Sequence, residues 1–178
     1  MAALPAGLSC ASIRAAMHLP TFLLASLLFA TGAGAQERRN VFEDPFLQVT
    51  SGLPGCPVPR GPGFTEDEVR EEAHSRAQHG TSCFHSGRCR LPNSYLYDKE
   101  IAPRVQQYLR LDGRFGDTSV WISGQRRLVT LTGCVRTGQQ KQEMERAVLL
   151  VDDVMGVVNQ LTVGVAAKPA YPVAEPGR

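Results

Sequence analysis

Hydrophobic residues recur at helical spacing in two segments of the second half of the chain. The first segment ends near Asp112-Gly113, and its hydrophobic positions are Ile101, Val105, Tyr108 and Leu109. The second follows Thr137 and Gln140, which have the spacing of a capping box, and its hydrophobic positions are Met144, Ala147, Val148 and Val151. Such three- and four-residue spacings put hydrophobic side chains on one face of a helix. Each segment is therefore predicted to form an amphipathic helix.

Three other segments have the two-residue alternation of β-strands. They are residues 119–123 (SVWIS), 128–135 (LVTLTGCV) and 157–163 (VVNQLTV), and residues 124–127 have the composition of a turn. The order helix–strand–strand–helix–strand predicts a small α+β domain with both helices on one face of a three-stranded sheet. Beyond the helical stripes, the predicted core comprises Val120, Ile122, Val129, Leu131, Val154, Val158, Leu161 and Val163.

The segments on either side of this domain lack a sustained period. Residues 36–64 are rich in proline and glycine, which predicts an irregular arm without regular elements. Thr65 and Glu68 form a capping box that predicts a short helix at about 66–79. The predicted divisions of the chain are an N-terminal extension (36–97), a folded domain (98–164) and a flexible tail (165–178).

The first 35 residues have the layout of a secretory signal peptide. They contain no acidic residue, and an apolar run at 21–31 is followed by Ala33-Gly34-Ala35, a small-residue pattern that signal peptidase cleaves. The run is about half the roughly 20 residues that a membrane-spanning helix needs. We therefore predict a signal peptide at 1–35 that is removed before Gln36, and a periplasmic or secreted mature chain. A start at Met17 gives the same mature chain.

The charge balance narrows the classes of partner. The formal net charge is +2 over 178 residues. A balance so near zero gives no general attraction to nucleic acid, and any attraction to a membrane has to come from local basic patches. We therefore expect no nucleic-acid partner.

The predicted mature chain keeps four cysteines, Cys56, Cys83, Cys89 and Cys134. An even number in an exported chain predicts two disulfides, and four cysteines allow three pairings. The pairing that we favour closes a local loop between Cys83 and Cys89. It also ties the irregular arm to the second predicted strand through Cys56 and Cys134.

The stretch 78–90 (QHGTSCFHSGRCR) also raises the possibility of a metal site, because His79 and His85 accompany Cys83 and Cys89. Zinc-binding cysteines are usually separated by two to four residues, whereas five residues separate this pair, and export favours oxidation of the thiols. We therefore expect a loop stapled by a disulfide, with no metal ligand and no cofactor.

Two motifs resemble those of the BON domain (bacterial OsmY and nodulation domain). One is the hydrophobic-x-hydrophobic-x-Gly strand at 129–133, and the other is the Val-x-Asn-x-Leu-x-Val pattern at 157–163. The resemblance covers about 98–164, and the chain departs from it where Arg127 and Asp153 stand in place of glycine. It implies an envelope protein that contacts phospholipid surfaces, in a family that includes proteins of transport, secretion and envelope or osmotic stress.

The resemblance brings no agreed catalytic residues, and the chain has neither a G-x-S-x-G nor an H-E-x-x-H motif. We therefore predict a non-enzymatic module. The candidates for lipid contact have a basic or an interfacial aromatic side chain, and are Arg126, Arg127, Arg136, Lys141 and Trp121. Each basic side chain adds about 1 kcal/mol of attraction to an anionic leaflet. The alternative is a structural or protein-interaction module that docks an envelope protein on the open sheet face and the extension; the sequence leaves the ligand and the oligomeric state open.

Overall fold

The computed structural model describes residues 36–175. The predicted signal peptide, residues 1–35, lies outside the described residues, as do residues 176–178. The helices are α1 (Glu66–Gly80), α2 (Ser82–His85), α3 (Asp98–Asp112) and α4 (Gly138–Leu149), with a 3-10 helix at Ser94–Tyr97. The strands are β1 (Phe46–Ser51), β2 (Ser119–Gln125), β3 (Leu128–Val135), β4 (Gly156–Asn159) and β5 (Thr162–Val163).

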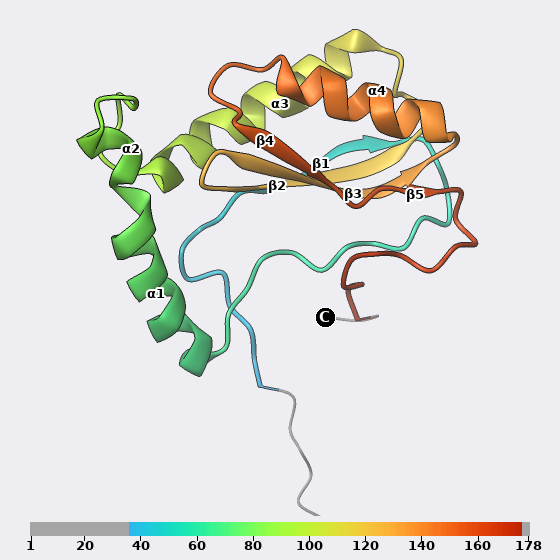
Figure 1. The fold of residues 1–178 in the computed structure, drawn as a ribbon. Helices are drawn as coiled ribbons and strands as arrows, with labels where there is room; N and C mark the ends of the chain where they lie inside the picture. The colour runs from blue at the N-terminus through green and yellow to red at the C-terminus, as the bar shows by residue number, and fades with distance from the viewer. Residues whose placement is uncertain (1–35, 176–178) are drawn as a thin grey trace, which may run out of the picture. The chain divides into compact units, whose positions relative to one another are not determined.

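These strands form one mixed sheet in the order β1-β2-β3-β4, with β5 also paired to β3. Strand β2 runs antiparallel to both β1 and β3, whereas β4 and β5 run parallel to β3. Helices α3 and α4 lie together on one face of the sheet (Figure 1). The predicted α+β class, the order of elements and the placement of both helices on one face are confirmed.

The sheet has five strands rather than the predicted three. The extra edge strand is β1, which lies in the arm that we predicted to be irregular and pairs with β2. Only Val49 of this strand is buried, so its sequence has no clear alternation. The last predicted strand is divided into β4 and β5 by Gln160 and Leu161.

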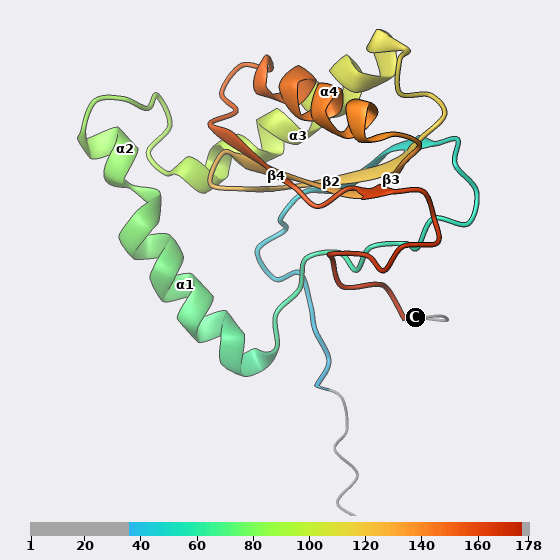
Figure 2. The same cartoon turned by 45° about the vertical axis from the view of Figure 1, so that its right-hand side comes forward.

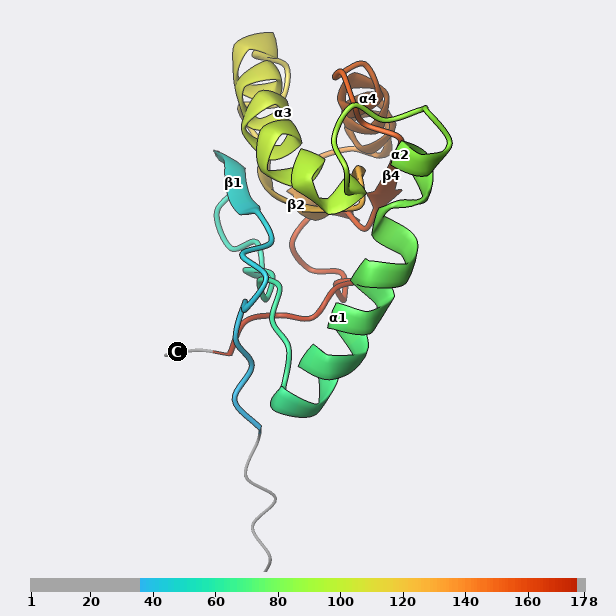
Figure 3. The ribbon, with the colours of Figure 1, turned by 90° about the vertical axis from the view of Figure 1, so that its left-hand side faces the viewer.

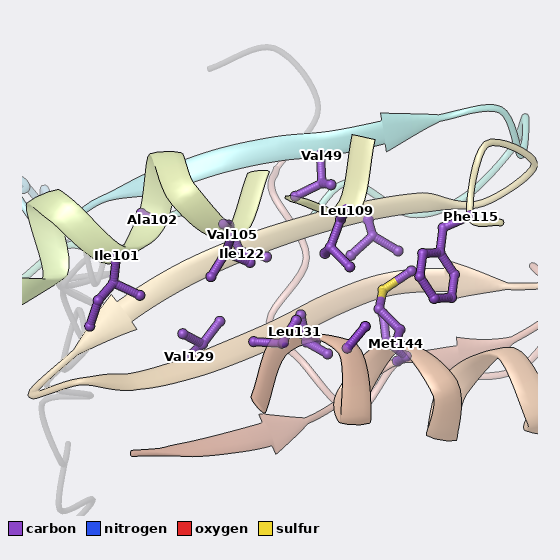
Figure 4. Packing of buried hydrophobic residues seen from close by; sticks show 14 of the residues in the cluster. Val49, Ile101, Ala102, Val105, Leu109, Phe115, Ile122, Val129, Leu131 and Met144 are labelled. Carbon is purple, nitrogen blue, oxygen red and sulfur yellow. The ribbon is translucent and has the colours of Figure 1, made fainter. Parts of the chain in front are cut away.

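The hydrophobic core lies between the two helices and the sheet. In Figure 4 the labelled side chains of α3 point toward those of β2 and β3. Most predicted core positions, including Met144, are buried there, together with Tyr97 and Phe115, which the sequence pattern did not indicate. Three predicted core residues are exposed instead: Tyr108 on α3, and Val158 and Val163 on the short strands β4 and β5 that follow β3 in the sheet.

Gly133 explains the glycine of the hydrophobic-x-hydrophobic-x-Gly strand. Its φ is +120°, a backbone conformation that side chains disfavour, and a Cβ there would lie 2.2 Å from the backbone oxygen of Ser119 on β2. A side chain at this position would force β2 and β3 apart. The glycine is therefore needed for the close pairing of the two central strands.

The sheet face opposite the helices is covered by the chain itself. A disulfide joins Cys56 of the arm to Cys134 of β3, with an S–S distance of 2.08 Å. Figure 1 shows the segment between β1 and α1 and the C-terminal segment running beneath the sheet. The predicted open sheet face is therefore not free for a partner.

The segment that we predicted to be a flexible tail is docked as far as Ala174. Tyr171 is buried, and its hydroxyl donates to the Pro57 oxygen at 2.9 Å. The backbone N–H of Arg60 donates to the Pro172 oxygen at 2.8 Å, and that of Ala174 donates to the Val58 oxygen at 2.9 Å. The sequence pattern missed this because proline-rich segments have no period, although their carbonyl groups still accept hydrogen bonds.

Helix α1 runs away from the sheet on the side opposite α3 and α4 (Figures 2 and 3). The predicted capping box at its start is present, since Thr65 and Glu68 exchange side-chain and backbone hydrogen bonds. Arg76 attaches the helix to the arm, because its guanidinium pairs with Asp44 at 2.5 Å and lies 4.1 Å from the centre of the Phe42 ring. A second disulfide, Cys83–Cys89, closes the loop that follows α1.

The two disulfides are expected to stabilise the fold unequally. Cys56–Cys134 spans 78 residues and Cys83–Cys89 spans 6, so the chain-entropy model gives about 4–5 and about 2 kcal/mol respectively. The measurement is guanidinium denaturation of the paired variants Cys56→Ser/Cys134→Ser and Cys83→Ser/Cys89→Ser. Equal losses of unfolding free energy, or a larger loss for the second pair, would contradict this ranking.

Candidate functional site

The turn between β2 and β3 consists of Arg126 and Arg127, which have φ values of 56° and 68°. A two-residue hairpin turn with both φ values positive strongly favours Asn-Gly, because most side chains disfavour this backbone region. The family resemblance leads us to expect glycine at Arg127 and also at Asp153, where φ is 72°. At both positions the backbone adopts the left-handed conformation that glycine favours. The chain therefore departs from the expected glycine in its side chain and not in its backbone conformation.

The buried carboxylate of Asp98 holds this unusual turn. Its Oδ2 accepts the backbone N–H of Arg126 and its Oδ1 accepts that of Arg127, both at 2.7 Å. Asp98 is the first residue of α3 and is only 1% exposed. The two charge-assisted hydrogen bonds therefore connect the start of α3 to the tip of the hairpin and offset part of the backbone strain.

The side chain of Arg127 connects the turn to two neighbouring loops. Its Nε donates to the Asp153 backbone oxygen at 2.8 Å, and its Nη1 lies 3.2 Å from Cys89 Sγ. The guanidinium also lies 4.7 Å from the centre of the Tyr97 ring, and the side chain is 15% exposed. We predicted Arg127 as a lipid contact, but this side chain is committed to the interior of the turn region.

Arg126 is in the opposite situation. Its side chain is exposed and has no hydrogen bond or ion pair with any residue in the range 36–175. It lines a cavity of about 320 Å³ together with Arg88 and Ser94, and with Met155, which is 60% exposed. The backbone N–H of Met155 donates to the Arg127 oxygen at 2.9 Å, so this apolar side chain is fixed beside the turn.

The other lipid-contact candidates lie elsewhere. Trp121 is only 8% exposed, so it is not at the surface as predicted. Arg136 pairs with Asp117 at 3.0 Å, and Lys141 donates from Nζ to the Leu161 oxygen at 2.8 Å. The length of β3, roughly 25 Å at about 3.3 Å per residue, separates Arg136 from the turn. The five candidates therefore do not form one surface.

The remaining residues of the cavity come from the extension that precedes the predicted folded domain. They include His79, Ser82 and Cys83, and the disulfide Cys83–Cys89 fixes the loop that carries Arg88. Both cysteines are oxidised, so neither thiolate can bind a metal ion. Among the described residues no group of three or more His, Cys, Asp or Glu side chains is placed to hold a metal. Sequence reasoning did not associate this loop with the turn, because no local pattern signals their contact.

Burial raises the pKa of Asp98 from its usual 3.8 to about 6. The backbone N–H groups of Arg127 and Arg126 act in the opposite direction, because they stabilise the charged form. Because the pKa of Asp98 is raised overall, the removal of this carboxylate from water has a larger effect on its pKa than the two hydrogen bonds. The group that holds the turn therefore titrates at mildly acidic pH.

Residues 97–165 match the family model of the BON domain. The chain is therefore a BON domain-containing protein, as the resemblance over about 98–164 predicted. Searches of curated proteins and of solved structures found no match. The matched region contains Asp98 and the Arg126-Arg127 turn, whereas Arg88 and Ser94 precede it.

The BON domain and the two disulfides indicate the cellular compartment in which the protein acts. The BON domain is generally associated with phospholipid membranes or with structural roles, and together with two disulfides it fits an extracytoplasmic protein. Within residues 36–175 none of the helices has the length and apolar character needed to cross a membrane.

Replacing Asp98 by Asn is expected to change how stability depends on pH. Because the pKa of Asp98 is raised from 3.8 to about 6 in the folded chain, the folded state binds a proton that the unfolded state lacks between these values. The contribution of Asp98 to the free energy of unfolding therefore falls as pH rises from about 4 to about 6, by up to about 3 kcal/mol.

The measurement is urea denaturation of wild type and Asp98→Asn at several pH values from about 4 to about 7. The lost hydrogen bonds of the variant give an offset that does not depend on pH, so only the slope of the difference tests the titration. The free energy of unfolding of wild type minus that of Asp98→Asn is expected to fall as pH rises. A value that stays constant or increases would contradict the expectation.

Proposed function

We propose that this chain is a non-enzymatic module of the cell envelope that binds phospholipid membrane surfaces peripherally. The proposal places the mature chain in the periplasm or outside the cell, after cleavage before Gln36. Its family association with phospholipid membranes supports the proposal, as do the two disulfides. The binding surface is the end of the molecule that contains the β2–β3 turn, which faces the viewer in Figure 3.

The observation that carries the proposal is the combination of free basic and exposed apolar side chains at this end. Arg126 and Arg88 are exposed and have no acidic partner in residues 36–175. Three large hydrophobic residues are also exposed there: Met155 and Leu128 next to the turn, and Phe84 in the loop 83–89 that the disulfide Cys83–Cys89 closes. Basic side chains attract anionic headgroups, and apolar side chains at the same surface gain by entering the headgroup region.

The expected affinity is low and sensitive to salt. Each basic side chain contributes about 1 kcal/mol near an anionic leaflet, and this attraction falls off within a Debye length of about 8 Å at physiological ionic strength. Two free arginines therefore give reversible binding, which the apolar residues strengthen according to the area that they bury. The turn end is suited to a peripheral contact rather than to permanent anchoring.

The alternative, a structural or protein-interaction module, has less support in this chain. We expected a partner to dock on the open sheet face, but residues 52–64 and the C-terminal segment run beneath it (Figure 1). A partner protein would therefore have to bind at another surface. The absence of enzymatic activity remains part of the proposal.

Arg126→Glu is expected to weaken binding to anionic vesicles by about 30-fold, because one attractive charge becomes a repulsive one, a change of about 2 kcal/mol. The measurement is co-sedimentation with vesicles of phosphatidylcholine and phosphatidylglycerol at low salt. Lys168→Glu makes the same change of charge at an exposed position in the C-terminal segment and is expected to have little effect. Raising the salt concentration is expected to release the wild-type protein.

Failure of the wild-type protein to bind phosphatidylglycerol vesicles at low salt would overturn the proposed function. Equal losses of vesicle affinity in Arg126→Glu and Lys168→Glu would show that only the net charge of the protein matters. That result would contradict the proposal that the end containing the β2–β3 turn is the binding surface. Phe84→Ser and Met155→Ser test the apolar part of the surface. Each is expected to weaken vesicle binding by a factor that changes little as salt is raised, because salt screens charges and does not screen the burial of apolar area.

A further inference from the structure

We propose that the cavity between the stapled loop and the β2–β3 turn is a binding site for a phosphate group. The stapled loop is the segment 83–89, closed by the disulfide Cys83–Cys89, and the cavity has a volume of about 320 Å³. Phosphate is the chemistry that a phospholipid headgroup and free inorganic phosphate share. The assignment of its source to a lipid headgroup rests on the proposed membrane function, whereas the phosphate site itself does not.

The charge of the cavity suits an anion. Among its lining residues are Arg88, Arg126 and Arg127, and none of the described residues that line it is acidic. Arg88 donates from Nε to Ser86 Oγ at 3.0 Å, and within residues 36–175 neither Arg88 nor Arg126 forms an ion pair. Arg127 pairs with Asp153 at 3.6 Å, so Arg88 and Arg126 are the two lining arginines without a counter-charge in this range. A phosphate in the cavity would supply that charge, because guanidinium groups form strong charge-assisted hydrogen bonds with phosphate.

Ser94 gives an independent indication of a ligand. The residue is 7% exposed and lines the cavity, and its Oγ is buried with no hydrogen-bond partner in the part of the chain that the structure describes. Buried hydroxyl groups in folded proteins nearly always have a partner, because leaving one unpaired is unfavourable. A phosphate oxygen in the cavity would accept the hydrogen bond that the Ser94 hydroxyl lacks.

The walls of the cavity are held in place before any ligand binds. The disulfide Cys83–Cys89 fixes the loop, and Arg127 joins this loop to the turn through its contact of 3.2 Å with Cys89 Sγ. Asp98 fixes the turn through its two backbone hydrogen bonds. A site that is already ordered loses little conformational entropy when a ligand binds, which favours affinity for a small anion.

The backbone conformation of the turn supports a ligand-binding role for the side chain of Arg126. Asn or Gly would adopt its φ of 56° with less strain. The side chain of Arg127 in the same turn contacts Asp153, Cys89 and Tyr97, but that of Arg126 has no such contacts within the part of the chain that the structure describes. An arginine at a strained position with a free guanidinium is accounted for by a ligand in the cavity that it lines.

The size and rim of the cavity favour a phosphodiester over a bare ion. Small-ligand sites usually have volumes of about 300–1,000 Å³, so this cavity accommodates a glycerol or headgroup unit in addition to the phosphate. Met155 is 60% exposed and contributes an apolar side chain to the lining of the cavity. This arrangement places a lipid phosphate among the arginines and directs the rest of the lipid toward the exposed apolar residue.

The test uses the full mature chain, with both disulfides formed, in a phosphate-free buffer. Inorganic phosphate and glycerophosphoglycerol are the soluble probes, and amide chemical shifts report both the affinity and the position of binding. We expect shifts at residues 79–94 and 126–127, with tighter binding of the diester. Ser94→Ala is expected to weaken binding about fivefold, and Arg88→Gln and Arg126→Asn about tenfold each.

Two variants separate binding from folding. Asn tolerates the positive φ of residue 126, so Arg126→Asn is expected to keep or raise stability while it weakens the binding of the probe. Arg70→Gln removes one exposed positive charge from α1 outside the cavity and is expected to leave the affinity unchanged. Wild-type affinity in Ser94→Ala, Arg88→Gln and Arg126→Asn, or no binding of either probe, would overturn the phosphate site.

Vesicles of phosphatidylglycerol and phosphatidylcholine distinguish the two sources of phosphate. If Ser94→Ala and Arg88→Gln weaken both probe binding and vesicle binding, the ligand is a lipid headgroup. If probes bind in the cavity but vesicles do not bind wild type, the proposed membrane function fails while the phosphate site stands, with free phosphate as its ligand. If vesicles bind and the probes do not, the membrane function stands and the phosphate site fails.

Discussion

The carboxylate of Asp98 is the constraint on which the turn end of this molecule depends. It lies at the start of α3 and accepts both backbone N–H groups of the Arg126-Arg127 turn at 2.7 Å. Those bonds hold two arginines in a backbone conformation that usually requires Asn-Gly. From this turn, the side chain of Arg127 contacts Cys89 Sγ and the Asp153 backbone oxygen, so that the loop closed by Cys83–Cys89 and the loop at Asp153 both meet the turn.

The surface that we propose for membrane binding is assembled from two parts of the chain. The matched BON region contributes Asp98 and the arginine turn, and the preceding extension contributes the stapled loop with Arg88 and Ser94. The two disulfides serve different parts of this assembly, because one closes the loop beside the turn and the other fastens the arm to the opposite sheet face. The extension and the domain therefore each supply part of the lining of the cavity beside the turn.

The elements that the sequence predicted correctly are those with a local signal. The helical stripes of α3 and α4, the capping box of Thr65 and Glu68 and the alternation of β2 and β3 all arise from residues within a few positions of one another. Thr137 caps α4 as predicted, but Gln140 accepts from the backbone N–H of Arg136 rather than from that of Thr137. Strand β1 escaped prediction because an edge strand with one buried residue, Val49, is held mainly by backbone hydrogen bonds to β2. The docking of Tyr171 escaped for a similar reason, since its partners are backbone groups of the arm.

The sequence by itself determined the family, the layered α+β core and a set of basic residues from which a surface could be built. Only the tertiary structure decided which of these residues are free. Arg127 and Arg126 are neighbours with the same chemistry, yet the side chain of Arg127 bonds to groups 26 and 38 residues away. The side chain of Arg126 has no hydrogen bond or ion pair within residues 36–175. Contacts over such separations depend on how the loops meet in space, and hydrophobic periodicity describes only the element in which it occurs.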